Sequence, residues 1–270
     1  MTLQDNINHT DLDGSESGGF DNAISGNAIS DQLDFSKFIE GCSDLGISLS
    51  DRQVRQFDIY YHMMAEKNKV MNLTAITEFE EVVSKHYLDS LLVVRHADMS
   101  KVSNILDMGT GAGFPGIPLK IVFPQIHMTL ADSLNKRILF LNEVIEKCHL
   151  DGIDTVHARA EEMGRNKAYR EKYDLVVSRA VANLSTLTEY CLPFVRKGGM
   201  FISYKAADVE DEFRAAEKAI AGLGGKCKNP VYDRVPHTDL ERSFIIISKV
   251  KNTPARYPRK AGLPSKEPIS

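Results

Sequence analysis

The chain has 270 residues, 43% of them hydrophobic and 26% charged, which is typical of a globular protein with one large domain or a domain with an appendage. No apolar run approaches the ~20 residues of a membrane helix, and no basic region precedes an apolar core at the N-terminus, so we expect neither a membrane span nor a signal peptide. The four cysteines lie far apart and none forms a Cys-x-x-Cys pair, which argues against a zinc site or a disulfide framework and predicts a cytoplasmic protein.

Acidic residues are concentrated at the N-terminus. Residues 1–34 carry seven carboxylates and no Lys or Arg, against a total charge of −4, so residues 35–270 sum to +3. A mildly basic folded part is compatible with a nucleic-acid partner but does not require one. Residues 1–33 are polar and cannot bury enough apolar surface to order themselves, so we expect a disordered acidic tail there.

Residues 34–100 are expected to form a small helical N-terminal cap. Apolar residues recur at helical spacing over residues 35–45. Ser50 is a typical helix N-cap, and an apolar helical stripe follows it. After an interruption at residues 72–74, a third helix is expected over residues 79–94.

Residues 101–250 alternate between expected strands and helices. We expect strands at residues 104–107, 127–131, 155–157, 175–178, 200–204, 231–235 and 244–250. The expected helices lie at residues 115–122, 134–148, 184–194 and 209–223. This alternation predicts an α/β fold with a doubly wound parallel sheet. The last two strands have no helix between them and should pair as a hairpin, so the seven-stranded sheet ends in an antiparallel strand. Such a reversal is typical of the Rossmann-like class I methyltransferases that use S-adenosylmethionine (SAM).

A glycine-rich loop over residues 104–116 joins the first expected strand to a helix. Counted from Gly109, the third position is also glycine, but Phe114 occupies the sixth, where a dinucleotide-binding loop requires its last glycine. No Gly-Lys-Ser/Thr follows, so a P-loop is excluded. The loop resembles motif I of SAM-dependent methyltransferases, with Asp107 ending the strand and Gly109 and Gly111 beside the cofactor. An ordinary glycine-rich turn is the alternative.

Two further strand ends carry candidate cofactor-binding residues. Asp132 ends the second strand and is expected to accept hydrogen bonds from a ribose, with helix capping as the alternative. Ser133 follows it. Ala160 and Glu161 follow the third strand, at a turn that borders the adenine in such folds, and a solvated helix start is the alternative.

Ser178 and Arg179 lie at the exit of the fourth strand, where open α/β sheets place their reacting groups. We predict that these two residues are catalytic. Arg179 is expected to pair with the carboxylate of SAM or with an RNA phosphate, and a surface arginine is the alternative.

Patterns typical of other chemistries are absent. The Asn/Asp-Pro-Pro-Tyr/Phe motif of amino-group methylation does not follow the fourth strand. Cys191 lies in an expected buried helix, which makes it a poor nucleophile for cytosine methylation. His86, Asp89 and Ser90 share a helix face, but a mid-helix serine lacks the strained turn and oxyanion hole of a hydrolase. The sequence therefore favours a reaction that needs neither the amino-methylation motif, nor a nucleophilic cysteine, nor a catalytic serine.

Residues 251–270 are rich in Pro, Lys and Arg and show no apolar period, so a basic, extended C-terminal tail is expected. Cations that rim one mouth of the fold would form a track for RNA phosphates. The candidate RNA contacts are Lys136, Arg137, Arg256, Arg259 and Lys260.

Residues 72–76, 86–91, 107–118 and 178–180, in this order, resemble the RsmG (GidB) family of small-subunit ribosomal RNA guanine-N7 methyltransferases. The resemblance covers about residues 35–270. It implies a SAM site made by Gly109, Phe114, Ala160, Glu161 and Arg179. It also implies methyl transfer to N7 of a guanine in 16S rRNA by direct in-line attack, with the small ribosomal subunit as partner. No metal is expected, and a monomer is expected.

Two other classes of function remain open at this point. One is a class I methyltransferase that acts on a small molecule or a protein. The other is a non-catalytic module that binds SAM or RNA.

Overall fold

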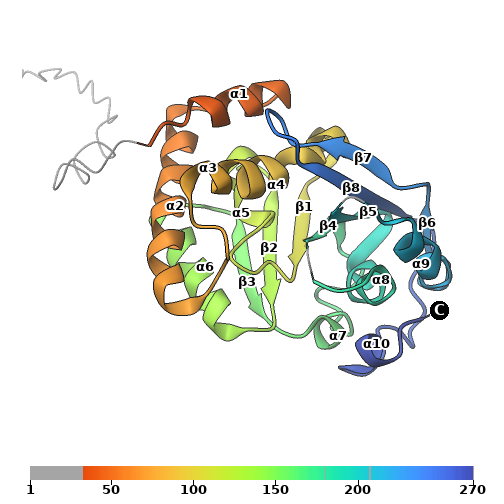
Figure 1. Cartoon of the computed structure of the whole chain (residues 1–270). Coiled ribbons are helices and arrows are strands. Elements are labelled where there is room, and N and C mark those ends of the chain that lie inside the picture. Colours follow the sequence, from red (N-terminus) through yellow and green to blue (C-terminus); the bar gives the residue numbers. More distant parts are fainter. Residues whose placement is uncertain (1–32, 180, 207, 270) are drawn as a thin grey trace, which may run out of the picture. The chain divides into compact units, whose positions relative to one another are not determined.

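An eight-stranded sheet forms the centre of the computed structural model, which describes residues 33–179, 181–206 and 208–269 (Figure 1). The predicted disorder of the acidic N-terminal segment concerns residues that lie outside this description, apart from Leu33. The strands are β1 (Asn104–Met108), β2 (His127–Asp132), β3 (Ile153–His157), β4 (Tyr173–Arg179), β5 (Val195–Ala206), β6 (Gly225–Cys227), β7 (Val231–Arg234) and β8 (Glu241–Lys249).

The strand order is β3-β2-β1-β4-β5-β8-β6, and β7 pairs with β8. The first five strands are parallel, whereas β8 runs antiparallel to β5. The predicted hairpin of β7 and β8 and the predicted strand reversal are therefore confirmed. The expected number of seven strands was wrong because β6, with only three residues, shows no alternating apolar pattern. The order reverses between β1 and β4, and ligands of open α/β sheets bind at such a point.

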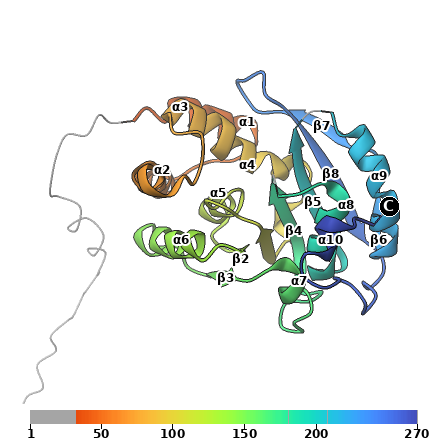
Figure 2. The same ribbon diagram turned by 60° about the horizontal axis from the view of Figure 1, so that its bottom comes forward.

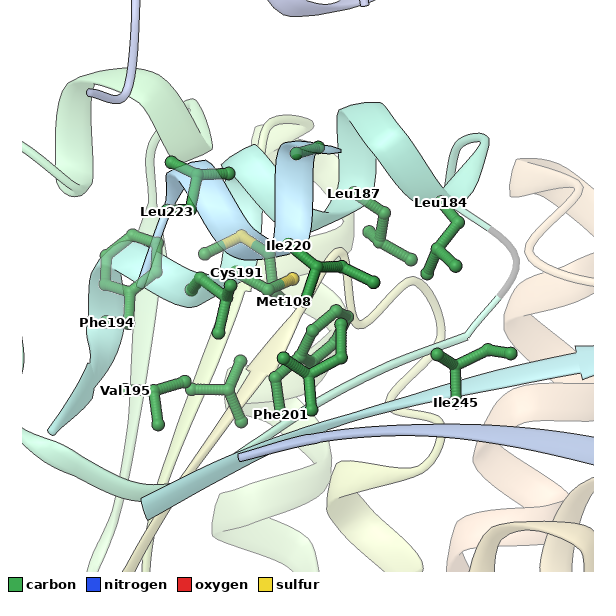
Figure 3. Close-up of a cluster of buried hydrophobic side chains, with 14 of the residues drawn as sticks. Met108, Leu184, Leu187, Cys191, Phe194, Val195, Phe201, Ile220, Leu223 and Ile245 are labelled. Atoms are coloured by element: carbon green, nitrogen blue, oxygen red, sulfur yellow. The ribbon is translucent and has the colours of Figure 1, made fainter. Parts of the chain in front are cut away.

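Helices cover both faces of the sheet. Figures 1 and 2 show α2 (Asp51–Met71), α5 (Gly116–Val122) and α6 (Asn135–Lys147) on one face and α8 (Leu184–Cys191) and α9 (Glu210–Gly222) on the other. Figure 3 shows Leu184, Leu187 and Ile220 of these last helices facing Phe201 of β5 and Ile245 of β8. These apolar side chains are fully buried or nearly so, and they form the core on this face.

The helical cap contains α1 (Ser36–Asp44), α2 and a long helical segment with irregular turns. That segment consists of α3 (Phe79–Val82), the π-helix η1 (Val83–Leu88), α4 (Asp89–Leu91) and the 3₁₀-helix η2 (Leu92–Arg95). The single helix expected over residues 79–94 is thus present but widened in its middle. The predicted N-cap is also present, because Ser50 and Gln53 form a reciprocal capping box at α2. A 3₁₀-turn, η3 (Met99–Lys101), leads into β1.

The C-terminal segment is packed against the domain, which corrects the prediction of an extended tail. It contains α10 (Leu263–Lys266), and Thr253 and Pro264 are buried. Polar contacts with α7 (Ala160–Met163), with α8 and with the loop before β4 hold it in place. Because these contacts are polar, they produce no apolar period in the sequence from which the packing could have been predicted. Another short turn, η4 (Leu192–Phe194), links α8 to β5. Within the described residues, no helix is both long and apolar enough to cross a membrane.

Candidate functional site

The glycine loop turns sharply between β1 and α5. Gly109 and Gly111 adopt φ values of 73° and 63°, a region that L side chains disfavour. The N–H of Gly109 donates to the carbonyl of Ala131 at 2.8 Å, which ties the loop to β2. A Cβ at Gly109 would lie 2.5 Å from Cγ2 of Val181. The loop therefore packs closely against the exit of β4, where only glycine fits.

Asp107 lies beneath this loop and is fully buried. Its Oδ2 accepts hydrogen bonds from Oγ1 of Thr110 at 2.7 Å and from the N–H of Gly116 at 2.8 Å. Its Oδ1 is buried and has no hydrogen-bond partner within the described residues. Burial raises the pKa of Asp107 to about 6, although its two hydrogen bonds and the charge of Arg179 lower it. An unpartnered carboxylate oxygen at this place suits a cationic ligand.

A cavity of about 230 Å³, here called the glycine-loop cavity, opens at the ends of β1, β2 and β3. Five residues predicted to bind the cofactor line it: Gly109, Asp132, Ser133, Ala160 and Glu161. Tyr190, Gly262 and Ser265 also line it and were not predicted. Tyr190 and the other two residues come from α8 and the C-terminal segment, far from the glycine loop in sequence, and their spacing carries no recognisable motif.

Asp132 holds the floor of the glycine-loop cavity and is buried. Its Oδ2 accepts from the N–H of Gly111 at 3.0 Å and from Nη1 of Arg137 at 3.2 Å. Its Oδ1 accepts from the N–H of Leu134 at 2.9 Å, next to the start of α6. The carboxylate thus supports both the glycine loop and the helix start while it lines the cavity.

Glu161 lies in the wall of the same cavity and is only 5% exposed. Its Oε1 accepts a hydrogen bond from the N–H of Gly262 at 2.8 Å. Burial raises the pKa of Tyr190, and the charge of Glu161 raises it further. The predicted alternative for Glu161, a solvated helix start, is excluded by its burial.

A second cavity, of about 390 Å³, lies beyond the exit of β4 and is here called the Arg179 cavity. It is lined by Lys85, His86, Asp89, Arg179, Tyr204, Lys205, Ala206 and Arg242. Four of these side chains are cationic and one is a carboxylate, so the lining is basic.

Arg179 points into the helical cap. Its Nη1 donates to Oδ2 of Asp89 at 2.6 Å, and its Nη2 contacts Nδ1 of His86 at 3.2 Å. Its guanidinium lies over the ring of Phe114, 5.1 Å from the ring centroid. Asp89 is 1% exposed and also accepts from Nε of Arg242 at 2.6 Å. One buried carboxylate therefore holds two guanidinium groups at the Arg179 cavity.

His86 is held neutral between Phe114 and Arg179. Its ring stacks on Phe114 with a centroid distance of 4.3 Å. Burial lowers the pKa of His86 to about 3, and the nearby charge of Arg179 lowers it further. Nδ1 lies 3.2 Å from Nη2 of Arg179 and 3.1 Å from the carbonyl oxygen of Lys85, and Nε2 lies 2.9 Å from Oγ1 of Thr74, so both ring nitrogens have polar partners. Sequence reasoning assigned no role to Thr74, His86 or Asp89, although they lie within the motifs quoted for the family.

Four predicted site residues, Asp107, Gly111, Phe114 and Ser178, line neither cavity. Ser178 is fully buried, and its Oγ donates to the carbonyl of Met108 at 2.7 Å, which joins β4 to β1. This geometry argues against the predicted catalytic role of Ser178, because it lines neither cavity. Phe114 turns away from the glycine-loop cavity and packs against Tyr60 and His86.

Two of the five candidate RNA contacts are paired with carboxylates of the domain. Arg137 pairs with Asp132, and Arg259 pairs with Glu189 at 2.7 Å. Arg256 lies over the ring of its neighbour Tyr257. Lys136 donates to the carbonyl of Met71 at 3.4 Å, and Lys260 is exposed. Their contact with RNA stays a prediction. In the part of the chain that the structure describes, no group of three His, Cys, Asp or Glu side chains is arranged to hold a metal.

The motifs predicted a family, and the comparisons with known proteins identify it. The family model for rRNA small subunit methyltransferase G, GidB, matches residues 53–233. The chain belongs to this family. It is 53% identical to the ribosomal RNA small subunit methyltransferase G of Lachnoclostridium phytofermentans, covering 87% of this chain and 98% of that relative. The homologous methyltransferase of Exiguobacterium sp. is 50% identical over the same shares of the two chains. That of Bacillus subtilis is 47% identical, covering 88% and 99%.

Membership of the GidB family confirms the predicted class I methyltransferase fold and SAM as the cofactor. The residues at the glycine loop fit this cofactor. Gly109 lines the glycine-loop cavity, and Asp107, beneath the loop, is a buried carboxylate whose Oδ1 has no hydrogen-bond partner within the described residues. Asp132 and Glu161 place two further buried carboxylates along the glycine-loop cavity, where they can accept hydrogen bonds.

Proposed function

We propose that this protein transfers a methyl group from SAM to N7 of a guanine in 16S rRNA of the small ribosomal subunit. The observation that carries the proposal is the pairing of two unlike cavities at the exit of β4. Val181 lines the glycine-loop cavity, and Arg179, two residues earlier, lines the Arg179 cavity. The first cavity is bordered by carboxylates, and the second is basic.

SAM, when bound, supplies an electrophilic methyl group. The chain contributes the binding surface for it: the glycine loop allows close approach, Asp132 offers its carboxylate to donors of the cofactor, and Asp107 and Glu161 hold the loop and Gly262 in place. These groups are buried and already oriented by backbone N–H groups. They can therefore align the methyl group without reorganisation, which is the main contribution needed when the acceptor is already nucleophilic.

The Arg179 cavity fits the RNA side of the reaction. A polyanion is attracted to Lys85, Arg179, Lys205 and Arg242, and guanidinium groups match phosphate oxygens in geometry. Asp89 holds Arg179 and Arg242 in fixed positions. The cavity thus supports recognition of a nucleotide next to the methyl donor.

The lining of the Arg179 cavity also favours an acceptor that needs no general base. Guanine N7 carries an in-plane lone pair and no proton at neutral pH, so it can attack the methyl group directly. The Nδ1 of His86 is engaged by Arg179, and Asp89 is bound in two ion pairs. Neither side chain is available to remove a proton, whereas methylation of an amino group would release one.

The monomeric state stays a prediction. An rRNA substrate would also place the protein in the cytoplasm. The basic residues Lys136, Arg256 and Lys260 stay candidates for wider RNA contacts, since none of them pairs with a buried carboxylate of residues 33–179, 181–206 or 208–269.

The test uses 16S rRNA and small subunits from cells that lack this activity. Each is incubated with the protein and SAM, and N7-methylguanine is mapped by reduction and chain cleavage. We expect one guanine to be modified by the wild-type protein. Methylation at a different atom, or of small acceptors in place of rRNA, would contradict the proposal. Lys101→Ala, which alters a surface side chain 81% exposed, serves as the control variant and should methylate normally.

A further inference from the structure

The C-terminal segment, residues 251–269, is seated by polar side chains of the domain. Arg170 donates to the carbonyl of Thr253 at 2.7 Å and to that of Tyr257 at 2.8 Å. Arg165 donates to the carbonyl of Pro258 at 3.1 Å. Thr186 of α8 donates to the carbonyl of Pro264 at 3.0 Å. These contacts satisfy backbone groups along the segment, so it has a defined path over the domain.

Two buried carboxylates fix the part of the segment that faces the glycine-loop cavity. Glu189 is fully buried and accepts from the N–H of Arg259 at 2.6 Å and from its Nη2 at 2.7 Å. Glu161, which itself lines the cavity, accepts from the N–H of Gly262 at 2.8 Å. A buried carboxylate without its partner is costly, so both contacts hold the segment firmly.

This seating places Gly262 and Ser265 in the lining of the glycine-loop cavity, which Met108 and Asp132 also line. Tyr190 and Glu161 connect them to the body of the domain. Gly262 has a φ of 82°, and a Cβ there would meet no atom within 4 Å. A side chain at this position would thus act through the backbone conformation alone.

We propose that the C-terminal segment is the outer wall of the SAM site: Gly262 and Ser265 bind the cofactor, and Glu161 is a positioning residue that holds Gly262 in place. The proposal rests on the assignment of SAM to the glycine-loop cavity. It assigns the segment to cofactor binding, whereas its basic composition predicted a role in RNA binding. Arg259, which the composition marks as a phosphate contact, serves here to anchor the wall on Glu189.

The first test measures SAM affinity by calorimetry for Gly262→Val and Glu161→Ala. We expect each to weaken SAM binding by at least about tenfold. Glu161→Gln keeps an acceptor oxygen for the N–H of Gly262 and should stay within about threefold of wild type. The matched control is the double variant Lys260→Ala/Lys266→Ala, which removes two exposed charges from the same segment and should keep wild-type SAM affinity. RNA affinity without SAM should be unchanged in Gly262→Val.

A second measurement uses the unmodified chain and does not depend on the folding of any variant. Amide hydrogen exchange of residues 259–266 should slow when SAM is added. Unchanged exchange in these residues would contradict the proposal that the C-terminal segment forms part of the SAM site. A folded Gly262→Val protein whose SAM affinity stays within about twofold of wild type would contradict it as well. These outcomes are separate from the proposed function. If the protein binds SAM but does not methylate rRNA, the proposed guanine-N7 activity is contradicted, whereas the proposed role of the C-terminal segment in SAM binding is not.

Discussion

At the scale of single residues, Asp107 links cofactor binding to pH. Its pKa is raised to about 6 in the folded protein, mainly by burial, from an ordinary value of 3.8. A raised carboxyl pKa means that the folded state without ligand binds the proton more tightly than the unfolded state. The contribution of Asp107 to the free energy of unfolding is therefore highest below pH 3.8 and falls as the pH rises from 3.8 to 6. A cationic ligand, in contrast, binds more tightly when the Asp107 carboxyl group is ionised than when it is protonated.

We therefore predict that SAM affinity is constant above pH 7 and falls by up to about tenfold per pH unit below pH 6. Calorimetric titrations between pH 5 and pH 8 measure this. Asp107→Asn should bind SAM more weakly and lose the pH dependence, because the amide does not titrate. His86 does not interfere, since its pKa of about 3 lies below this range. A wild-type affinity that is flat across the range would contradict the role of Asp107.

Arg179 is the second residue whose effect the structure makes testable. We predict that Arg179→Ala lowers methyl transfer by roughly 100-fold, the usual scale for loss of one oriented donor. It should also lower the free energy of unfolding by about 1–3 kcal/mol, because Asp89 would keep only Arg242 as an ionic partner. SAM affinity should change little, since Arg179 does not line the glycine-loop cavity.

Turnover, thermal unfolding and SAM calorimetry separate these effects for Arg179→Ala, with Lys101→Ala as the surface control. Near-wild-type turnover would show that Arg179 has only a packing role. Without this ion pair, an exposed arginine at a strand exit could be replaced by lysine or alanine with little change in the free energy of unfolding. The ion pair with Asp89 explains why a loop arginine at a strand exit stabilises the fold.

At the scale of secondary-structure elements, the π-helix η1 gives the Arg179 cavity its shape. It spans Val83–Leu88, and His86 together with Asp89, the first residue of α4, meets Arg179. A π-turn contains one more residue than an α-turn, so it changes the direction in which later side chains point. Apolar periodicity over residues 79–94 predicted the helix but could not predict this local widening.

We predict that deletion of Ser84 converts η1 into an ordinary α-helical turn. The residues on either side would then rotate relative to each other by about one helical position, roughly 100°. His86 and Asp89 both follow the deleted residue, so they would turn together relative to α3 and away from Arg179, and methyl transfer should be lost while SAM still binds at the glycine loop. Ser84→Ala, which keeps the chain length, should remain active. Full activity of the deletion variant would show that the π-turn is dispensable.

The elements also show how far the sequence alone predicts this protein. Gly109, Asp132 and Glu161 were predicted because each follows the end of an apolar strand, and parallel strand ends meet at one edge of a sheet. Gly262 was not predicted, since nothing local relates it to Glu161, 101 residues away in the chain. The direction of Arg179 depends in the same way on Asp89, 90 residues away. Periodicity predicts elements, whereas long-range polar contacts decide which side chains complete a site.

At the scale of the whole molecule, the basic residues divide into those that support the fold and those that can meet RNA. We predict that Lys136→Ala and Lys260→Ala each reduce the salt slope of RNA binding by about one unit if they contact phosphates. Arg259→Gln should leave that slope unchanged, because Glu189 already neutralises this guanidinium. Binding of 16S rRNA fragments between about 50 and 200 mM salt measures the slopes. An equal loss in all three variants would contradict this division.

Phe114 belongs to the glycine loop in sequence, yet its ring lies under His86 and Arg179 at the other cavity. A displacement of the loop on SAM binding would move this ring and, with it, the two side chains that line the Arg179 cavity, which we propose as the RNA side of the site. The two ligands would then be coupled, and thermodynamic reciprocity requires that each change the affinity of the other by the same factor. If that factor favours binding, RNA would bind more tightly with SAM in place than with the glycine-loop cavity empty, whereas the opposite sign would make each ligand expel the other.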